Sequence, residues 1–140
     1  MALLKGMVVF YRILADIVVV VHASYVSFVV LGQLAILIGW LRRWGWIRNL
    51  PFRLAHLGAI LVVVLESWCG ITCPLTTWER WLREQAGDTT YEGDFIANWV
   101  HRVLFYHFPP WVFIVGYTAF GALVVLTFAL APPKRKAARP

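Results

Sequence analysis

The chain has 140 residues, of which 61% are hydrophobic and only 14% charged. A soluble domain carries about a quarter charged residues, so this single domain cannot cover its own apolar surface and needs lipid to do so. The net charge of +6 is concentrated in two basic segments beside apolar runs. That distribution favours anionic lipid headgroups over nucleic acid as a partner.

The first apolar run, about 17–41, contains no charged residue and is long enough to span a bilayer. The residues before it are also largely apolar, and no Gly or Pro lies near 22–27 to turn the chain. We therefore expect one long helix whose first turns project beyond the membrane or lie along its interface. Arg12 and Asp16 are one turn apart and are expected to pair.

Two further spans follow. The second is expected at about 52–70, after a loop that contains Gly45 and Pro51. The third is expected at about 111–131, between two Pro-Pro pairs, and a basic tail at 132–140 follows it. The predicted fold is an all-α membrane protein with three transmembrane helices.

The distribution of charge predicts the orientation. All seven acidic residues fall on one side of the three predicted spans. Basic loops stay in the cytoplasm, so the N-terminus is expected outside and the C-terminus in the cytoplasm. The loop arginines are expected to contact anionic lipid: Arg42, Arg43, Arg48 and Arg53. Tryptophan prefers the headgroup layer, and six are assigned to the membrane interface: Trp40, Trp44, Trp46, Trp68, Trp99 and Trp111.

The connection 71–108 is expected to form a helical extracytoplasmic cap. Thr76 and Glu79 have the spacing of a capping box, which predicts a short helix that Gly87 ends. A second, amphipathic helix is expected to begin near Asp94 and to lie on the outer leaflet or over the ends of the spans.

Ionisable residues within a span are the first candidates for function. Counted along their helices, His22 lies about 8 Å and Glu66 about 6 Å below the outer surface, so the two can pair. Asp16 can join through water, and Glu79 can descend from the cap. Two interpretations stay open: a cluster that carries protons or binds a ligand, and a structural pair that fixes how the first two helices dock.

The remaining His and Cys residues give weaker indications. His56 lies near the cytoplasmic end, on the order of 15 Å or more from His22, so the two cannot share a haem. We expect His56 to contact headgroups or Arg53. Cys69 and Cys73 can form a disulfide only if the helix opens between them, and both the bridge and two thiols stay open. No metal-binding spacing is found, and no cofactor is predicted for the chain alone.

Small residues at four-residue spacing predict tight helix packing at Ala35 and Gly39 on the first span, and at Thr118 and Ala122 on the third.

Several of these residues carry a resemblance to a known family: the Asp16 and His22 region, His56, Glu66, Cys73-Pro74-Leu75-Thr76, Glu79 and the stretch Tyr91 to Ile96. They resemble a bacterial family of small multi-spanning inner-membrane proteins, the domain of unknown function number twenty-seven eighty-four. The resemblance covers nearly the whole chain and implies placement in a bacterial inner membrane. Of the two cysteines, only Cys73 belongs to the family pattern. The resemblance implies no reaction.

The small size, the aromatic-rich cap and the lack of a catalytic motif favour a non-enzymatic role. We expect an accessory subunit that packs against and stabilises a larger inner-membrane complex, respiratory or photosynthetic. Within that complex the chain can contact a pigment, a haem or a quinone. The alternative is a membrane enzyme, or a redox or proton-relay component, that uses the outer-face cluster of His22, Glu66 and Asp16.

Overall fold

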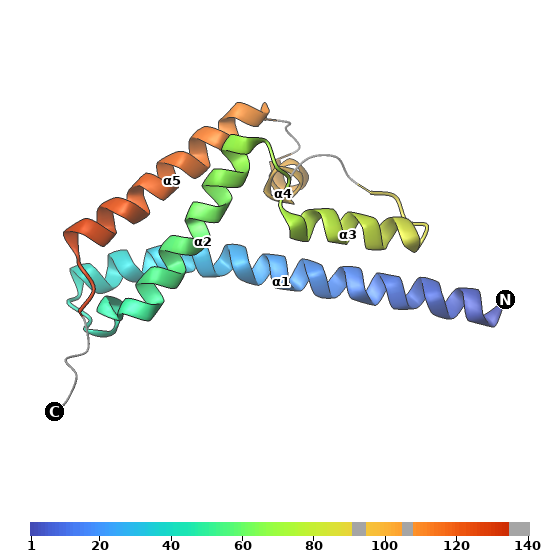
Figure 1. Ribbon diagram of the computed structural model, residues 1–140, viewed down its shortest axis with the longest axis horizontal. Helices are drawn as coiled ribbons and strands as arrows, with labels where there is room; N and C mark the ends of the chain where they lie inside the picture. The colour runs from blue at the N-terminus through green and yellow to red at the C-terminus, as the bar shows by residue number, and fades with distance from the viewer. Residues whose placement is uncertain (91–94, 105–107, 135–140) are drawn as a thin grey trace.

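The computed structural model describes residues 1–90, 95–104 and 108–134. In this part of the chain the elements are α1 (Ala2–Leu41), the 3₁₀ turn η1 (Trp46–Arg48), α2 (Leu50–Cys69), α3 (Pro74–Gln85), α4 (Phe95–Leu104) and α5 (Pro110–Leu130) (Figure 1). α1, α2 and α5 are long and apolar enough to cross a membrane. The predicted all-α fold, with three helices long and apolar enough to span a membrane, is therefore confirmed. Asp94 and residues 135–140 of the predicted tail lie outside the described residues.

α1 is one helix of 40 residues, as predicted, and rises about 60 Å. It ends because Arg43 adopts a left-handed conformation with φ of 57°. The backbone N–H of Trp44 then donates to the Gly39 carbonyl at 2.7 Å, and that of Arg43 donates to Trp40 at 3.3 Å. These two bonds form a Schellman motif, which satisfies the last carbonyls of the helix.

A capping asparagine sets the start of α2, and a glycine with a left-handed backbone sets its end. The Asn49 side chain accepts a hydrogen bond from the backbone N–H of Phe52, and Pro51 stands in the first turn, where its missing N–H costs nothing. At the other end Gly70 has φ of 65°, and the N–H of Ile71 donates to Glu66 at 2.9 Å. Both boundaries lie within two residues of the predicted ones.

The predicted capping box of α3 is wrong, although the helix and its end are present. α3 begins at Pro74 and its N-cap is Cys73, so Thr76 is already inside the helix and buried. Proline is favoured in the first helical position, and here it starts the helix two residues before the expected one. Gly87, with φ of 75°, follows the end of α3 as predicted.

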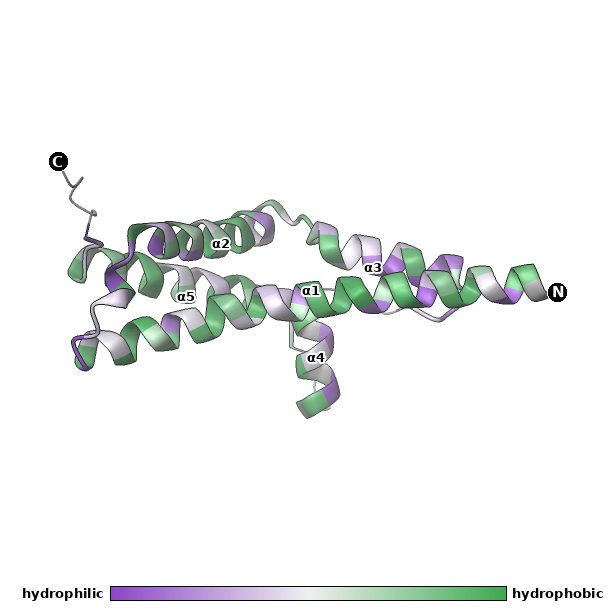
Figure 2. Ribbon diagram, turned by 90° about the horizontal axis from the view of Figure 1, so that it is seen from below, coloured by the Kyte–Doolittle hydropathy of each residue, from purple (hydrophilic) through white to green (hydrophobic). Residues whose placement is uncertain are grey.

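The helices form two packed pairs (Figures 1 and 2). α2 and α5 lie side by side and are both inclined to α1, while α3 runs along the N-terminal half of α1. A small apolar core joins the three long helices through Val29, Ile60, Val64 and Val124. At Gly121 of α5 an added Cβ would meet Val64 at 3.0 Å, so the absent side chain lets α5 approach α2.

α1 packs closely against the His56 side chain of α2 at Gly32, which the sequence had not indicated. An added Cβ there would lie 2.7 Å from the His56 ring. Gly39, which was expected to pack against another helix, instead faces Ile47 of the following turn, whose side chain an added Cβ would meet. The small residue at position 39 therefore lets the chain fold back after α1, while Gly32 sets the distance between helices.

Candidate functional site at the junction of α1, α2 and α3

The four ionisable residues that the sequence singles out lie on three adjoining helices. His22 is on α1 and Glu66 is in the last turn of α2, while Glu79 on α3 has 3% of its surface exposed. Asp16 lies about two turns before His22 on α1 and is exposed. The fold brings these side chains toward one region of the molecule.

His22 and Glu66 line the same small cavity, of about 60 Å³, together with Tyr25, Cys73 and Thr76. The expectation that His22 and Glu66 lie close together is therefore met. A cavity of this size holds a few water molecules. Ligand pockets measure roughly 300–1,000 Å³, so a ring-sized ligand does not fit into it.

Two contacts fix the walls of this cavity. The His22 ring stacks on Phe95, the first residue of α4, with ring centroids 4.1 Å apart and an interplanar angle of 24°. The Tyr25 hydroxyl donates to the Ala59 carbonyl of α2 at 2.6 Å. Both His22 and Phe95 are buried. The cavity is therefore bounded by α1 and α2, the start of α3, the start of α4 and Tyr117 of α5.

The two cysteines are separate thiols in the structure. Of the two alternatives that the sequence left open, the unbridged one is present. Cys69 is exposed at the end of α2, and Cys73 is half-buried beside the cavity. Burial, reinforced by the nearby Glu66 carboxylate, raises the pKa of the Cys73 thiol. Cys73 is therefore a neutral thiol at neutral pH, which lowers its reactivity.

Ion pairs between α1 and the α3 region lie next to the cavity. Arg83 donates to Glu79 at 2.9 Å and to Asp16 at 3.3 Å. Arg12 donates to Asp88 at 2.6 Å. The predicted pairing of Arg12 with Asp16 is wrong, because α3 offers each of them a partner from across the interface. A base one turn before an acid is also the weaker order for a pair within one helix.

These pairs border a more polar pocket of about 420 Å³, which Glu79, Arg83 and Asp88 line together with Asn98 and Arg102 of α4. The hydrogen bond to Glu79 raises the pKa of Arg83 above its usual value. The hydrogen bond from the Arg12 guanidinium of α1 likewise holds the pKa of Asp88 below its usual value. Both shifts favour the charged forms of Arg83 and Asp88 at neutral pH, and the residues that line the pocket carry both signs of charge.

A second polar group, which sequence reasoning missed, lies between α1, α2 and α5 at the other end of the molecule. Arg53 is 2% exposed and donates to the carbonyl oxygens of Thr127 at 2.6 Å and Ala131 at 3.4 Å. Gln33 donates to the Thr127 hydroxyl at 3.2 Å. The guanidinium also lies 5.4 Å from the centre of the Phe128 ring. Arg53 thus satisfies the last carbonyls of α5, where the helix dipole favours a cation.

Two predictions about this end of the molecule are wrong. Arg53 was expected to contact anionic lipid, and headgroup contact was one of two alternatives for His56, yet both residues are buried. The other alternative for His56, an interaction with Arg53, is not contradicted, because the two residues are one turn apart on α2. His56 Nε2 lies 2.8 Å from the Val29 carbonyl, which only accepts, so this nitrogen carries the proton. The signal was present in the sequence, because Arg53 and His56 continue the helical spacing of the buried Ile60 and Val64.

The other residues predicted to lie at the membrane surface are placed as follows. Arg42 and Arg43 are exposed after α1, and Arg48 in η1 is half-buried. The six tryptophans assigned to the interface are all exposed: Trp40, Trp44, Trp46, Trp68, Trp99 and Trp111. The contact of these arginines and tryptophans with lipid stays a prediction. Among the described residues, no group of three His, Cys, Asp or Glu side chains could hold a metal ion.

A family model described as "Protein of Unknown function (DUF2784)" matches residues 12–133. The match covers most of the chain, so the protein belongs to this family, and the resemblance seen in the sequence is confirmed. No curated protein and no solved structure matches the chain.

Proposed function

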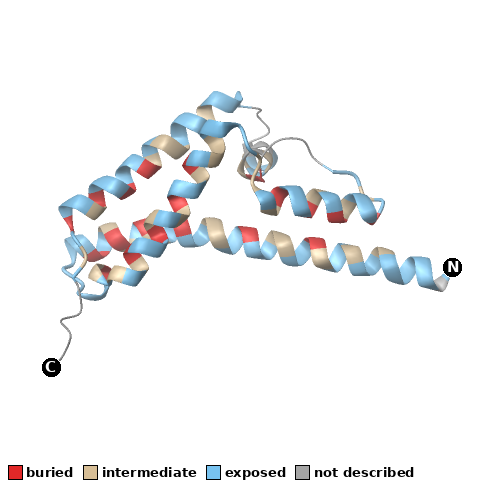
Figure 3. Cartoon of the chain, in the orientation of Figure 1, coloured by how far each residue is buried: buried red, intermediate tan, exposed pale blue. Residues whose placement is uncertain are grey.

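We propose that this member of the DUF2784 family is a small accessory subunit of a bacterial inner membrane, which packs against and stabilises a larger membrane complex. One observation carries the proposal. The N-terminal half of α1 exposes an apolar stripe on the side opposite its buried residues Ala15 and His22. Figure 3 shows that most of this half of α1 is exposed. The side chains of the stripe are 52–64% exposed: Val9, Ile13, Ile17 and Val20.

The surroundings of the stripe favour a protein partner over lipid. α1 rises about 60 Å, roughly twice the thickness of a hydrocarbon core. Its N-terminal half also carries Arg12 and Asp16, which pair with residues of the α3 region, and hydrocarbon strongly disfavours such charges. α1 runs without a break, so this half does not bend onto the bilayer while the rest crosses it (Figure 2). An apolar stripe beside solvated charges is typical of an interaction surface.

The proposed orientation keeps the N-terminus, α3 and α4 outside and the basic loop and tail in the cytoplasm. The partner complex would then contact α1 on the outer side of the membrane. A respiratory or photosynthetic assembly fits this arrangement, and any pigment, haem or quinone would be held mainly by that assembly.

Photo-crosslinking in native membranes tests the proposal. A benzophenone amino acid replaces Phe10, which is 57% exposed beside the stripe, or Val125, which is 49% exposed on α5 and serves as the control. The position 10 probe should capture one specific membrane protein, and the same protein should co-purify with the chain in mild detergent. An absorption spectrum of that fraction reports a pigment or a haem. Crosslinks to lipid alone, with the chain eluting by itself, would overturn the proposal.

A proton relay is the second candidate, and the cavity between His22 and Glu66 favours it. A cavity of about 60 Å³ accommodates water and not a quinone ring, so it fits the passage of protons better than the binding of an organic substrate. The relay would run through the imidazole, water and the Glu66 carboxylate. Asp16 and Glu79 would pass protons between the relay and the solvent at the protein surface.

Glu66→Gln separates the two candidates, with Glu84→Gln on the exposed side of α3 as the control. Under the relay hypothesis, Glu66→Gln abolishes proton-coupled activity of the partner complex while the position 10 crosslink persists. Under the subunit hypothesis, crosslink and activity change together or not at all. The control leaves both unchanged in either case.

A further inference from the structure

Two cations from distant parts of the sequence are held together at the end of the molecule opposite α3. The backbone N–H of Lys134 donates to the Arg48 carbonyl at 2.8 Å, and Arg48 Nε donates to the Pro132 carbonyl at 3.0 Å. Asn49 and Lys134 form an isolated β-bridge. The segment after α5 is thus fastened to the loop before α2. A pocket of about 570 Å³ results, lined by Arg48 and Lys134 together with Trp46 and Pro51.

Among the described residues, no acidic side chain lines this basic pocket. No acidic residue occurs in 17–65 or in 95–140, the segments that supply all three long helices at this end. The ion pairs of the described residues involve only Arg12 and Arg83 among the cations. Two adjacent cations without a carboxylate favour an anion from outside the protein. Because the Arg48 Nε is engaged, its terminal nitrogens are the donors left for a phosphate.

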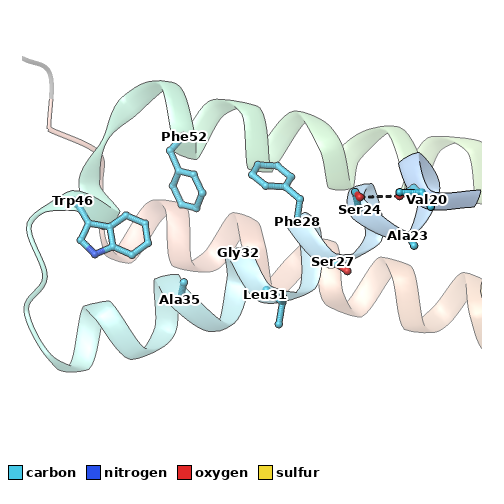
Figure 4. Close-up of a pocket in the computed structure, with 10 residues that line it drawn as sticks. All are labelled: Val20, Ala23, Ser24, Ser27, Phe28, Leu31, Gly32, Ala35, Trp46 and Phe52. Atoms are coloured by element: carbon cyan, nitrogen blue, oxygen red, sulfur yellow. Dashed lines mark hydrogen bonds between the residues drawn. The ribbon is translucent and has the colours of Figure 1, made fainter. Parts of the chain in front are cut away.

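An open apolar groove of about 630 Å³ begins beside this pocket (Figure 4). Small side chains of α1, among them Ala23, Ser27 and Ala35, lie along it, and the aromatic rings of Phe28 and Phe52 stand over it. From position 35 to position 20 the groove follows α1 for about 22 Å, which exceeds the roughly 15 Å thickness of one hydrocarbon leaflet. An acyl chain can therefore lie in it along its length.

Trp46 lines both the groove and the basic pocket. Its ring stacks on Trp44 with centroids 6.1 Å apart and meets Phe52 edge-on at 5.7 Å. These contacts hold the indole at the boundary between an apolar and a cationic surface. Tryptophan adopts the same position at the headgroup layer of a bilayer.

We propose that this composite surface binds one anionic phospholipid. Its phosphate lies between Arg48 and Lys134, and one acyl chain follows the groove past Trp46. The charge of the pocket, the apolar character and length of the groove, and their shared residue select this ligand over a zwitterionic lipid or a soluble anion. The site shares only Val20 with the α1 stripe and does not depend on the proposed function.

Native mass spectrometry of the full chain in mild detergent tests the proposal with phosphatidylglycerol and phosphatidylcholine of identical acyl chains. The wild type should retain one phosphatidylglycerol per chain and little phosphatidylcholine. Each cation contributes about a fivefold effect, so Arg48→Gln with Lys134→Gln should weaken retention roughly 30-fold. The matched control Lys5→Gln with Arg80→Gln removes the same charge at residues that line neither the pocket nor the groove, and it should keep the bound lipid.

The groove is tested by Ser27→Trp, which fills it, against Val30→Trp, an exposed α1 position that does not line it. Ser27→Trp should reduce lipid retention, and Val30→Trp should not. If the double cation variant fails to fold, Lys134→Gln alone keeps the backbone bond to Arg48 and should lower retention about fivefold.

Four results would overturn the proposal. Equal retention of both lipids would remove the preference for an anionic headgroup. Equal loss in the control pair would indicate diffuse attraction. Binding of inorganic phosphate that Ser27→Trp leaves unchanged, without bound lipid, would indicate a free-anion site. A photo-crosslink from position 27 to a protein would assign the groove to a partner helix.

Discussion

The contact between Gly32 of α1 and His56 of α2 gives a sharp test of the packing. Replacing Gly32 by alanine places a Cβ 2.7 Å from the His56 ring, about 0.7 Å short of the 3.4 Å at which ordinary contact begins. His56 cannot simply move aside. It is 1% exposed, its Nε2 bonds the Val29 carbonyl at 2.8 Å, and its ring is flanked by Phe28 and Phe52.

The expected loss follows from these contacts. If the helices separate, overpacking costs about 1–3 kcal/mol. If the His56 ring rotates, the lost bond leaves a buried carbonyl unsatisfied, at about 1–3 kcal/mol. The higher helix propensity of alanine offsets at most about 1 kcal/mol. Gly32→Ala should therefore lower the free energy of unfolding by about 1–3 kcal/mol.

The free energy of unfolding is measured by titrating the protein from dodecyl maltoside into SDS mixed micelles and following helicity. Gly58→Ala on α2 is the matched control, because an added Cβ there meets nothing within 4 Å. It should be neutral or stabilising by up to about 1 kcal/mol. The cost of Gly32→Ala should also largely disappear in a His56→Ala background. Equal stability of the two glycine variants, or an unchanged cost without the imidazole, would refute the proposed contact.

Three further predictions follow from the polar contacts. Arg53→Met should destabilise the protein by about 2–3 kcal/mol in the same titration, because the Thr127 carbonyl loses a buried charged donor. The lowered pKa of Asp88 gives a contribution to stability that is present above its ordinary pKa of 3.8 and is lost as the pH falls through the lowered value. Thermal melts recorded down to about pH 2 should lose this component in Asp88→Asn. Maleimide should label exposed Cys69 about tenfold faster than half-buried Cys73, as followed by mass spectrometry of single-cysteine variants.

Each of these three predictions would be contradicted by a specific result. An Arg53→Met variant as stable as the wild type would mean that desolvation of the guanidinium cancels its hydrogen bonds. Acid melts that Asp88→Asn leaves unchanged would place the acid sensitivity at other carboxylates. Equal labelling of the two thiols would contradict the burial of Cys73 beside the cavity.

The sequence alone determined the helices and where they end. A span is set by a local run of about 20 apolar residues, and its ends by residues with restricted or left-handed backbone preferences. Gly87, which was predicted to end α3, adopts a positive φ of 75°. The shared depth of His22 and Glu66 also followed from counting along two antiparallel helices, and both line one cavity.

The tertiary structure alone decided which polar side chains meet. The partners of Arg12 and Arg53 lie 76 and 74 residues away along the chain, and no local spacing identifies them. The position of Arg53 in a basic loop region suggested lipid, whereas the packing of α2 against the end of α5 buries it. The bond between Lys134 and Arg48 likewise needs α2 and α5 to lie side by side. Composition fixes which segments leave water, but the pairing of buried charges depends on how the helices cross.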